Sequence, residues 1–281
     1  MRHYLPPQIA SLVADWTRVA RVPTGTVSVQ LRDVGGPIAG RLEHMTHYAA
    51  STVKLAIGVT ALADIETRRT DQHHPVAVHD TFPGAGSREF RLSRADDNDD
   101  ATWNRLGASE TFGNLLERMI VDSSNIAANL VAQRVTLRAV GRTLGLAPAP
   151  AVTMSHLFGD RLAQASASRN AVTAAGLGAL MAAVARGHLI SPAATHGLIE
   201  LLARQTTRQM IPAGLPAGTW SAGKPGWFGE VNHDVQLVQP DGAPEYILAV
   251  CTTTGLGGDA AGLIASISSI TWKHWTAWHT S

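Results

Sequence analysis

Strand-like sequence lies at both ends of the chain and encloses a long helical middle. Residues 26–31 alternate apolar and polar side chains with a period near two and lead into a turn at Gly35-Gly36. Three more strands are predicted at 218–224, 230–239 and 245–254, with turn signals at 226–229 and 240–242. We therefore expect an α+β fold, in which an antiparallel sheet built from both termini is flanked by helices and carries an inserted all-helical lobe.

The rest of the chain is predominantly helical in pattern. Apolar residues at helical spacing predict helices over 7–20, 51–66, 109–120, 125–145, 170–186 and 192–204, and a terminal helix that includes 272–275. Residues 67–108 are polar and loop-rich, and the acidic run 96–100 is interpreted as a solvated tip. We assign residues 1–48 and 206–281 to a sheet lobe and residues 49–205 to a mostly helical lobe, with an active site between them.

Composition limits the classes of partner. The 281 residues carry a formal charge of +1, which disfavours nucleic-acid binding and a membrane-surface patch and favours a small-molecule or peptide-like substrate. No stretch reaches the length of a membrane span and no secretory leader is visible, so a cytoplasmic location is expected, or a periplasmic or secreted one if a leader has been trimmed. His73, His74 and His79 lie in polar loop without zinc-ligand spacing, so we predict no metal and no cofactor. The oligomeric state is left open.

Lysine is rare in this arginine-rich chain. Of its three lysines, Lys54 follows Ser51 by three residues, and Lys224 lies in a Gly-Lys-Pro-Gly segment. A buried lysine can lose its proton and act as a base, whereas arginine stays charged. On a helix, positions three apart share one face, so Ser51 at the helix N-cap and Lys54 are predicted to be close enough to interact. This pattern indicates a serine nucleophile with a lysine base.

Three ordered motifs resemble those of class A β-lactamases and penicillin-binding proteins. They are Ser51-Thr52-Val53-Lys54, Ser123-Ser124-Asn125 and Lys224-Pro225-Gly226, and the flanking YAASTVKL, NIAANLV and KHW segments are similar too. The resemblance covers nearly the whole chain. It implies a β-lactamase-like fold and a serine hydrolase that forms an acyl-enzyme on an amide, ester or lactam carbonyl.

The resemblance also implies roles for individual residues. Ser51 would attack the carbonyl, Lys54 would take its proton, and Ser123 would relay a proton to the leaving group. Lys224 would supply a positive field that lowers the pKa of Lys54 and attracts an acidic substrate group. Asn125 would bind the substrate amide and position Lys54.

The strand motif and its neighbours complete the expected substrate site. Backbone N–H groups of Ser51 and of Trp227, beside Gly226, would form the oxyanion hole. His233 lies about where class A enzymes often have a carboxylate-binding arginine. Pro225 replaces the usual threonine or serine and removes a hydroxyl and an N–H group. Altered substrate recognition is therefore expected.

The loop that should activate the deacylating water departs most from the family. Class A enzymes have a glutamate there, but residues 153–173 contain none, and Asp160 is their only carboxylate. We therefore predict poor deacylation of β-lactams. Two alternatives remain open: a true class A β-lactamase, and a non-catalytic penicillin-binding or sensing module.

Overall fold

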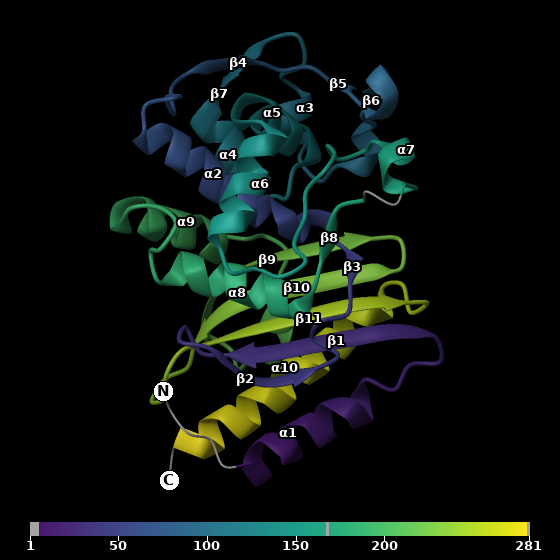
Figure 1. The fold of residues 1–281 in the computed structure, drawn as a ribbon, viewed down its shortest axis with the longest axis vertical. Coiled ribbons are helices and arrows are strands. Elements are labelled where there is room, and N and C mark those ends of the chain that lie inside the picture. The colour runs from purple at the N-terminus through teal and green to yellow at the C-terminus, as the bar shows by residue number, and fades with distance from the viewer. Residues whose placement is uncertain (1–5, 167–168, 280–281) are drawn as a thin grey trace.

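The computed structural model describes residues 6–166 and 169–279, and within these ranges the chain forms a five-stranded antiparallel sheet of order β2-β1-β11-β10-β9 (Figure 1). The strands are β1 Gly25–Arg32, β2 Pro37–Arg41, β9 Trp220–Phe228, β10 Val231–Gln239 and β11 Tyr246–Thr254. Strand β1 pairs with β11 over its whole length, from Gly25 opposite Thr254 to Arg32 opposite Ile247. The N-terminal and C-terminal segments thus share one sheet, which confirms the predicted α+β arrangement.

Two helices from the chain ends cover one face of the sheet. They are α1 Pro6–Val19 and α10 Asp259–His279, which lie side by side beneath the sheet in Figure 1. The alternation of β1 directs Val27 and Val29 into this core, where they pack with Trp16 and Trp275. Trp16 also donates a hydrogen bond from Nε1 to Thr271 Oγ1 at 3.0 Å, which satisfies its buried polar group.

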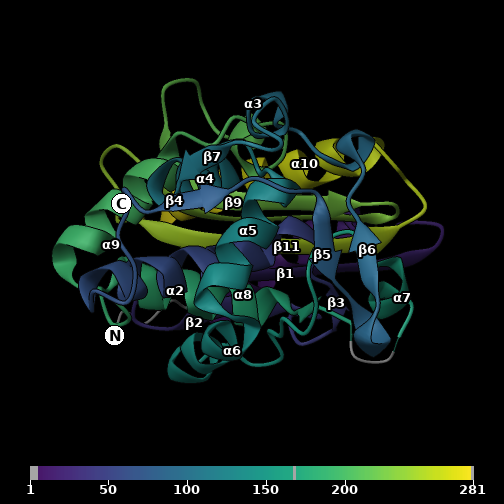
Figure 2. The same cartoon turned by 90° about the horizontal axis from the view of Figure 1, so that it is seen from above.

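The opposite face carries the helical part of the chain. Helix α8 Ala174–Ala185 packs on β1, β10 and β11, and α9 Pro192–Ala203 packs on β9. A Cβ atom on Gly178 would lie 2.6 Å from Gln30 Oε1, so glycine allows α8 to approach the sheet closely. Above α8 lie α2 Lys54–Glu66, α4 Phe112–Val121, α5 Asn125–Val135 and α6 Leu137–Leu146 (Figures 1 and 2).

Short elements connect these helices. They are strands β3 His47–Tyr48, β4 Pro75–Ala77, β5 Thr81–Pro83, β6 Glu89–Arg91, β7 Ser109–Thr111 and β8 Ala171–Val172; helices α3 Asp100–Trp103 and α7 Arg161–Gln164; and 3-10 turns η1 Ala50–Val53, η2 Ala85–Ser87, η3 Arg94–Asp96 and η4 Ile211–Gly214. The strands pair as β3 with β8, β4 with β7 and β5 with β6. The region predicted as loop from 67 to 108 therefore contains small hairpin-like pairings. None of the helices in the described part of the chain has the length and apolar character needed to cross a membrane.

Several predicted boundaries were wrong for local reasons. The helix expected over 125–145 is two helices, because Thr136 has a φ of 73° and its hydroxyl caps α6 by accepting from Ala139 N. Helix α4 begins only after the cap Thr111, and α8 only after the cap Thr173. Strand β9 extends to Phe228, into the segment 226–229 that was predicted as a turn. The third motif consequently lies inside an edge strand, where proline is tolerated.

Candidate active site

Ser51 lies in the 3-10 turn η1, immediately before the buried helix α2. The expectation that it caps this helix was wrong, because the cap positions Ala49 and Val53 make no side-chain capping bond and Ser51 is inside the turn. Its hydroxyl is instead 3.0 Å from Lys54 Nζ, as the spacing of three residues predicted. Ala50 has a φ of 45°, a conformation that costs about 1–3 kcal/mol for a non-glycine residue and often marks functional sites.

Lys54 lies fully buried at the start of α2. Besides Ser51 Oγ, its Nζ lies 2.6 Å from the Ser123 carbonyl oxygen and 2.7 Å from Asn125 Oδ1. Burial lowers the pKa of Lys54 to about 7, and the negative charge of Asp97 acts in the opposite direction. The amine is therefore poised to exchange a proton near neutral pH.

Ser123 lies between the two buried lysines. Its Oγ is 3.4 Å from Lys54 Nζ and 2.9 Å from Lys224 Nζ, and its φ is 60°. Lys224 reaches this point from β9, and burial followed by the positive charge of Lys54 lowers its pKa well below the usual value. We expected Lys224 to lower the pKa of Lys54; burial is the main cause of the lowered pKa there.

Asn125 and Asp97 fix the start of helix α5. Asn125 Nδ2 donates to the Asp96 carbonyl oxygen at 2.5 Å, which leaves Oδ1 to accept from Lys54. The Asp97 carboxylate accepts from the backbone N–H groups of Asn125 and Ile126 at 2.8 and 2.7 Å. Negative charge at a helix N-terminus is stabilising. Asp97 was not predicted from the sequence. This residue lies in an acidic run outside the three motifs, and nothing in that run indicates that it binds the start of α5.

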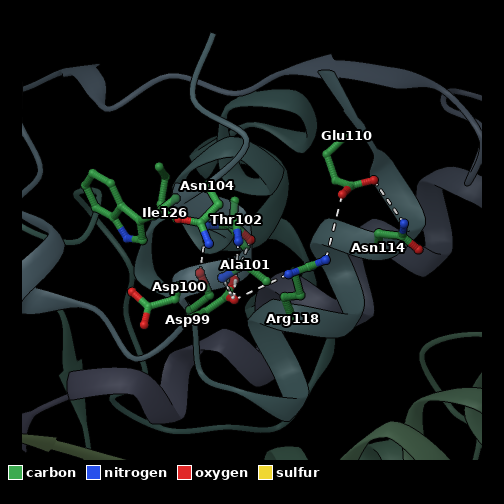
Figure 3. A network of polar contacts seen from close by, with 12 residues as sticks. Asp99, Asp100, Ala101, Thr102, Asn104, Glu110, Asn114, Arg118 and Ile126 are labelled. Atoms are coloured by element: carbon green, nitrogen blue, oxygen red, sulfur yellow. Dashed lines mark hydrogen bonds and ion pairs between the residues drawn. The ribbon is translucent and has the colours of Figure 1, made fainter. Parts of the chain in front are cut away.

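A polar network attaches the acidic segment to helix α4 (Figure 3). Asp99 caps α3, and its Oδ1 lies 3.4 Å from Arg118 Nη1 on α4. Arg118 also lies 3.8 Å from Glu110, and its carbonyl oxygen accepts from Ser124 N at 3.2 Å. The interpretation of 96–100 as a solvated tip was therefore wrong for Asp97 and Asp99. These contacts hold the turn that carries Ser123.

Gly226 brings strand β9 against the turn that carries Ser51. A Cβ atom there would lie 2.7 Å from Ser51 N and 2.8 Å from Thr52 N. Glycine is therefore required at this position for strand β9 to pass so close to the backbone of Ser51. An oxyanion hole made of the Ser51 and Trp227 N–H groups would need such an approach of the two segments.

A cavity of about 240 Å³ opens in front of Ser51. Asn125, Phe158 and Trp227 line it with Ser51. The remaining lining residues are Tyr48, Ala50, Leu92, Ala95, Asp96, Asp97, Asn98, Gly159, Arg161, Gln164, Phe228 and Gly229. The volume can take the reacting part of a small ester, amide or lactam.

His233 lies behind this cavity rather than in its wall. It is fully buried in β10, and its Nε2 is 2.7 Å from the Tyr48 carbonyl oxygen. Burial lowers its pKa to about 4, so the ring is neutral at physiological pH. The expected contact between His233 and a substrate carboxylate is thus not supported, since a short imidazole bonded to the backbone cannot reach the cavity as a long arginine would.

The sequence matches the profile of the beta-lactamase enzyme family over residues 11–275. The chain belongs to this family. Solved structures with the same fold include that of PBP-A, with a TM-score of 0.81, 18% identity and 97% coverage of both chains. A beta-lactamase from Xanthomonas campestris pv. campestris has a TM-score of 0.81 and 19% identity, covering 94% of this chain and 97% of that one. A beta-lactamase from Sphaerobacter thermophilus has a TM-score of 0.81 and 19% identity, covering 95% of this chain and 98% of that one. No curated protein matches the sequence.

Phe158, in the 153–173 loop, faces the buried Lys54 of this beta-lactamase family member. The centre of its ring is 4.6 Å from Lys54 Nζ. Its backbone is held from both sides by Asn129, whose Nδ2 donates to Phe158 O at 2.9 Å and whose Oδ1 accepts from Phe158 N at 2.8 Å. No pattern in the sequence predicted an aromatic ring at this place.

Asp160, the carboxylate of that loop, has a structural role. It is buried and accepts from Ala85 N at 2.8 Å and from Ala163 N at 3.0 Å, so that it caps α7. These bonds hold its carboxylate outside the lining of the cavity that Ser51 lines. Within residues 6–166 and 169–279, no three His, Cys, Asp or Glu side chains group closely enough to hold a metal ion.

Proposed function

We propose that this protein is a serine acyl-enzyme hydrolase or acyltransferase that acts on an amide, ester or lactam carbonyl. The observation that carries the proposal is the 3.0 Å contact between Ser51 Oγ and a fully buried lysine whose pKa is lowered to about 7. A hydroxyl beside a base of this strength can become a nucleophile at neutral pH. Membership of the beta-lactamase enzyme family is consistent with this chemistry.

The surroundings of Lys54 favour its action as a base. The Ser123 carbonyl oxygen and Asn125 Oδ1 are acceptors only, and both lie within 2.7 Å of Nζ. A neutral amine has two hydrogens, which these acceptors occupy. Its lone pair is then left for the proton of the Ser51 hydroxyl.

Acylation proceeds in two steps. Ser51 Oγ forms a bond to the carbonyl carbon while its proton passes to Lys54 Nζ, and the backbone N–H groups of Ser51 and Trp227 stabilise the oxyanion. The tetrahedral intermediate then collapses as the bond to the leaving oxygen or nitrogen breaks. The leaving group takes a proton from Ser123 Oγ, which is replenished from Lys224 or Lys54 at 2.9 and 3.4 Å.

Deacylation is the slow step in this proposal. Water or an amine must attack the acyl carbon and lose a proton, and general-base help for such a step is worth about 10²- to 10⁴-fold. Phe158 presents a ring, not a carboxylate, 4.6 Å from Lys54 Nζ, and Asp160 is bound to two backbone N–H groups elsewhere. A β-lactam should therefore remain attached for far longer than in an efficient β-lactamase.

Intact-mass spectrometry after exposure to penicillin and to a neutral aryl ester tests the proposal. We expect an acyl adduct that accumulates and decays slowly in the parent and in the Ser109→Ala control, which alters an exposed serine. The Ser51→Ala variant should form none. Rapid turnover of penicillin without accumulation would instead support a true β-lactamase. Stabilisation of the parent by ligand without any covalent adduct would support a non-catalytic sensing module.

A further inference from the structure

The charged side chains that line the cavity have a net negative charge. In the described part of the chain they are Asp96, Asp97 and Arg161, so two carboxylates oppose one guanidinium. Arg161 Nη2 is paired with Asp96 Oδ2 at 2.9 Å, and its guanidinium lies over the Phe228 ring at 5.6 Å. The Asp97 carboxylate is held by the backbone N–H groups of Asn125 and Ile126, and it also interacts with the charge of Lys54, which is buried outside the cavity lining.

Apart from Arg161, which is paired with Asp96, the other places that could offer a cation to a substrate carboxylate are closed. Lys224 is fully buried, and its Nζ is bound to Ser123 Oγ and, at 3.3 Å, to the Pro225 carbonyl oxygen. Pro225 offers neither a hydroxyl nor an N–H group to the cavity side of the edge strand. His233 is neutral and bonded to the Tyr48 carbonyl oxygen. A carboxylate in this cavity would lose its hydration without gaining a strong partner.

Aromatic side chains form the mouth of the same cavity. Trp227 and Phe228 on β9 are 37% and 42% exposed and follow one another at the end of the edge strand. Tyr48 lies beside Phe228, with 5.8 Å between ring centres, and Phe158 lies deeper, near Lys54. This wall can bury an apolar group or contact a cation through its ring faces.

We propose that this cleft selects uncharged or cationic acyl donors with an apolar group and rejects donors that carry a carboxylate. The inference rests on the proposed acyl-enzyme function and names the substrate class of that site. Neutral esters or amides with an alkyl or aromatic acyl chain are therefore the preferred substrates. β-Lactam antibiotics, which carry a carboxylate, acylate Ser51 slowly.

A matched series of p-nitrophenyl esters tests the selectivity. The acyl chains have equal length and end in a methyl, a trimethylammonium or a carboxylate group, and each acylation rate is divided by the rate of hydroxide-catalysed hydrolysis of that ester. At low ionic strength we expect the carboxylate ester to acylate Ser51 at least about tenfold more slowly than the methyl ester. The ammonium ester should match or exceed the methyl ester. Raising the salt concentration should reduce the difference.

Charge variants test the cause. Asp96→Asn removes a negative charge and frees Arg161, so it should narrow the methyl-to-carboxylate ratio by about threefold, whereas Arg161→Gln should widen it. Asp241→Asn, an exposed change in the turn between β10 and β11, should leave the ratio unchanged. A carboxylate ester that reacts as fast as the methyl ester would overturn the inference while leaving the acyl-enzyme function intact. Absence of acylation by all three esters would overturn both.

Discussion

Acylation of Ser51 should accelerate as the pH rises through about 7. Only neutral Lys54 can accept the serine proton, and burial lowers the pKa of this lysine from 10.5 to about 7. For a single group with this pKa, the neutral fraction rises from about one tenth at pH 6 to about nine tenths at pH 8. The acylation rate should therefore increase about tenfold over this interval and level off above it.

The assay is the burst of p-nitrophenol released from a neutral aryl ester in a single turnover, with the background hydrolysis at each pH subtracted. Lys54→Arg keeps a permanent charge at this position and should reduce the burst rate at least about 100-fold at every pH. Lys273→Arg is the matched control, because Lys273 is exposed on α10, far from the site. A rate that is flat or falls between pH 6 and 8, or a Lys54→Arg variant that retains the parent rate, would refute the role of Lys54.

Three further substitutions probe the residues around Ser51 and Lys54. Asp97→Asn should lower the midpoint of the same pH profile, because the Asp97 charge raises the pKa of Lys54; an unchanged or higher midpoint would contradict this. Phe158→Glu places a carboxylate near the lysine and should speed decay of a penicillin adduct at least tenfold, as followed by intact mass, if the missing base is the cause of slow deacylation. Gly226→Ala should slow acylation at least about 100-fold, because the added Cβ would clash with the turn that carries Ser51. Circular dichroism should show that this variant stays folded. Gly262→Ala on α10 is the control: no atom lies within 4 Å of the added Cβ, and the variant should retain the parent acylation rate.

The features that could be predicted from the sequence are those with local causes. Alternation in β1 and helical spacing in α2 depend on residues a few positions apart, and the contact between Ser51 and Lys54 follows from their separation of three. The meeting of Ser123 with both lysines has no local cause and was expected only from the resemblance to class A β-lactamases and penicillin-binding proteins. The sheet built from both termini followed from the arrangement of strand patterns along the chain.

The features that could not be predicted depend on tertiary contacts. Nothing local distinguishes Asp97, which binds the start of α5, from Asp100, which is exposed. The place of Phe158 is set by two hydrogen bonds to Asn129, which lies 29 residues away. His233 is kept buried by its hydrogen bond to the Tyr48 carbonyl oxygen, a contact between residues far apart in the sequence.

Peptide mapping of the acyl adduct tests the central claim most directly. After brief exposure of the parent protein to a neutral aryl ester and quenching in acid, the protein is digested and the modified residue is located by fragmentation. The account predicts that the acyl group is found on Ser51 and that the adduct is lost in Ser51→Ala. An acyl group on Ser123, Ser124 or a lysine in the parent protein, with Ser51 unmodified, would contradict it.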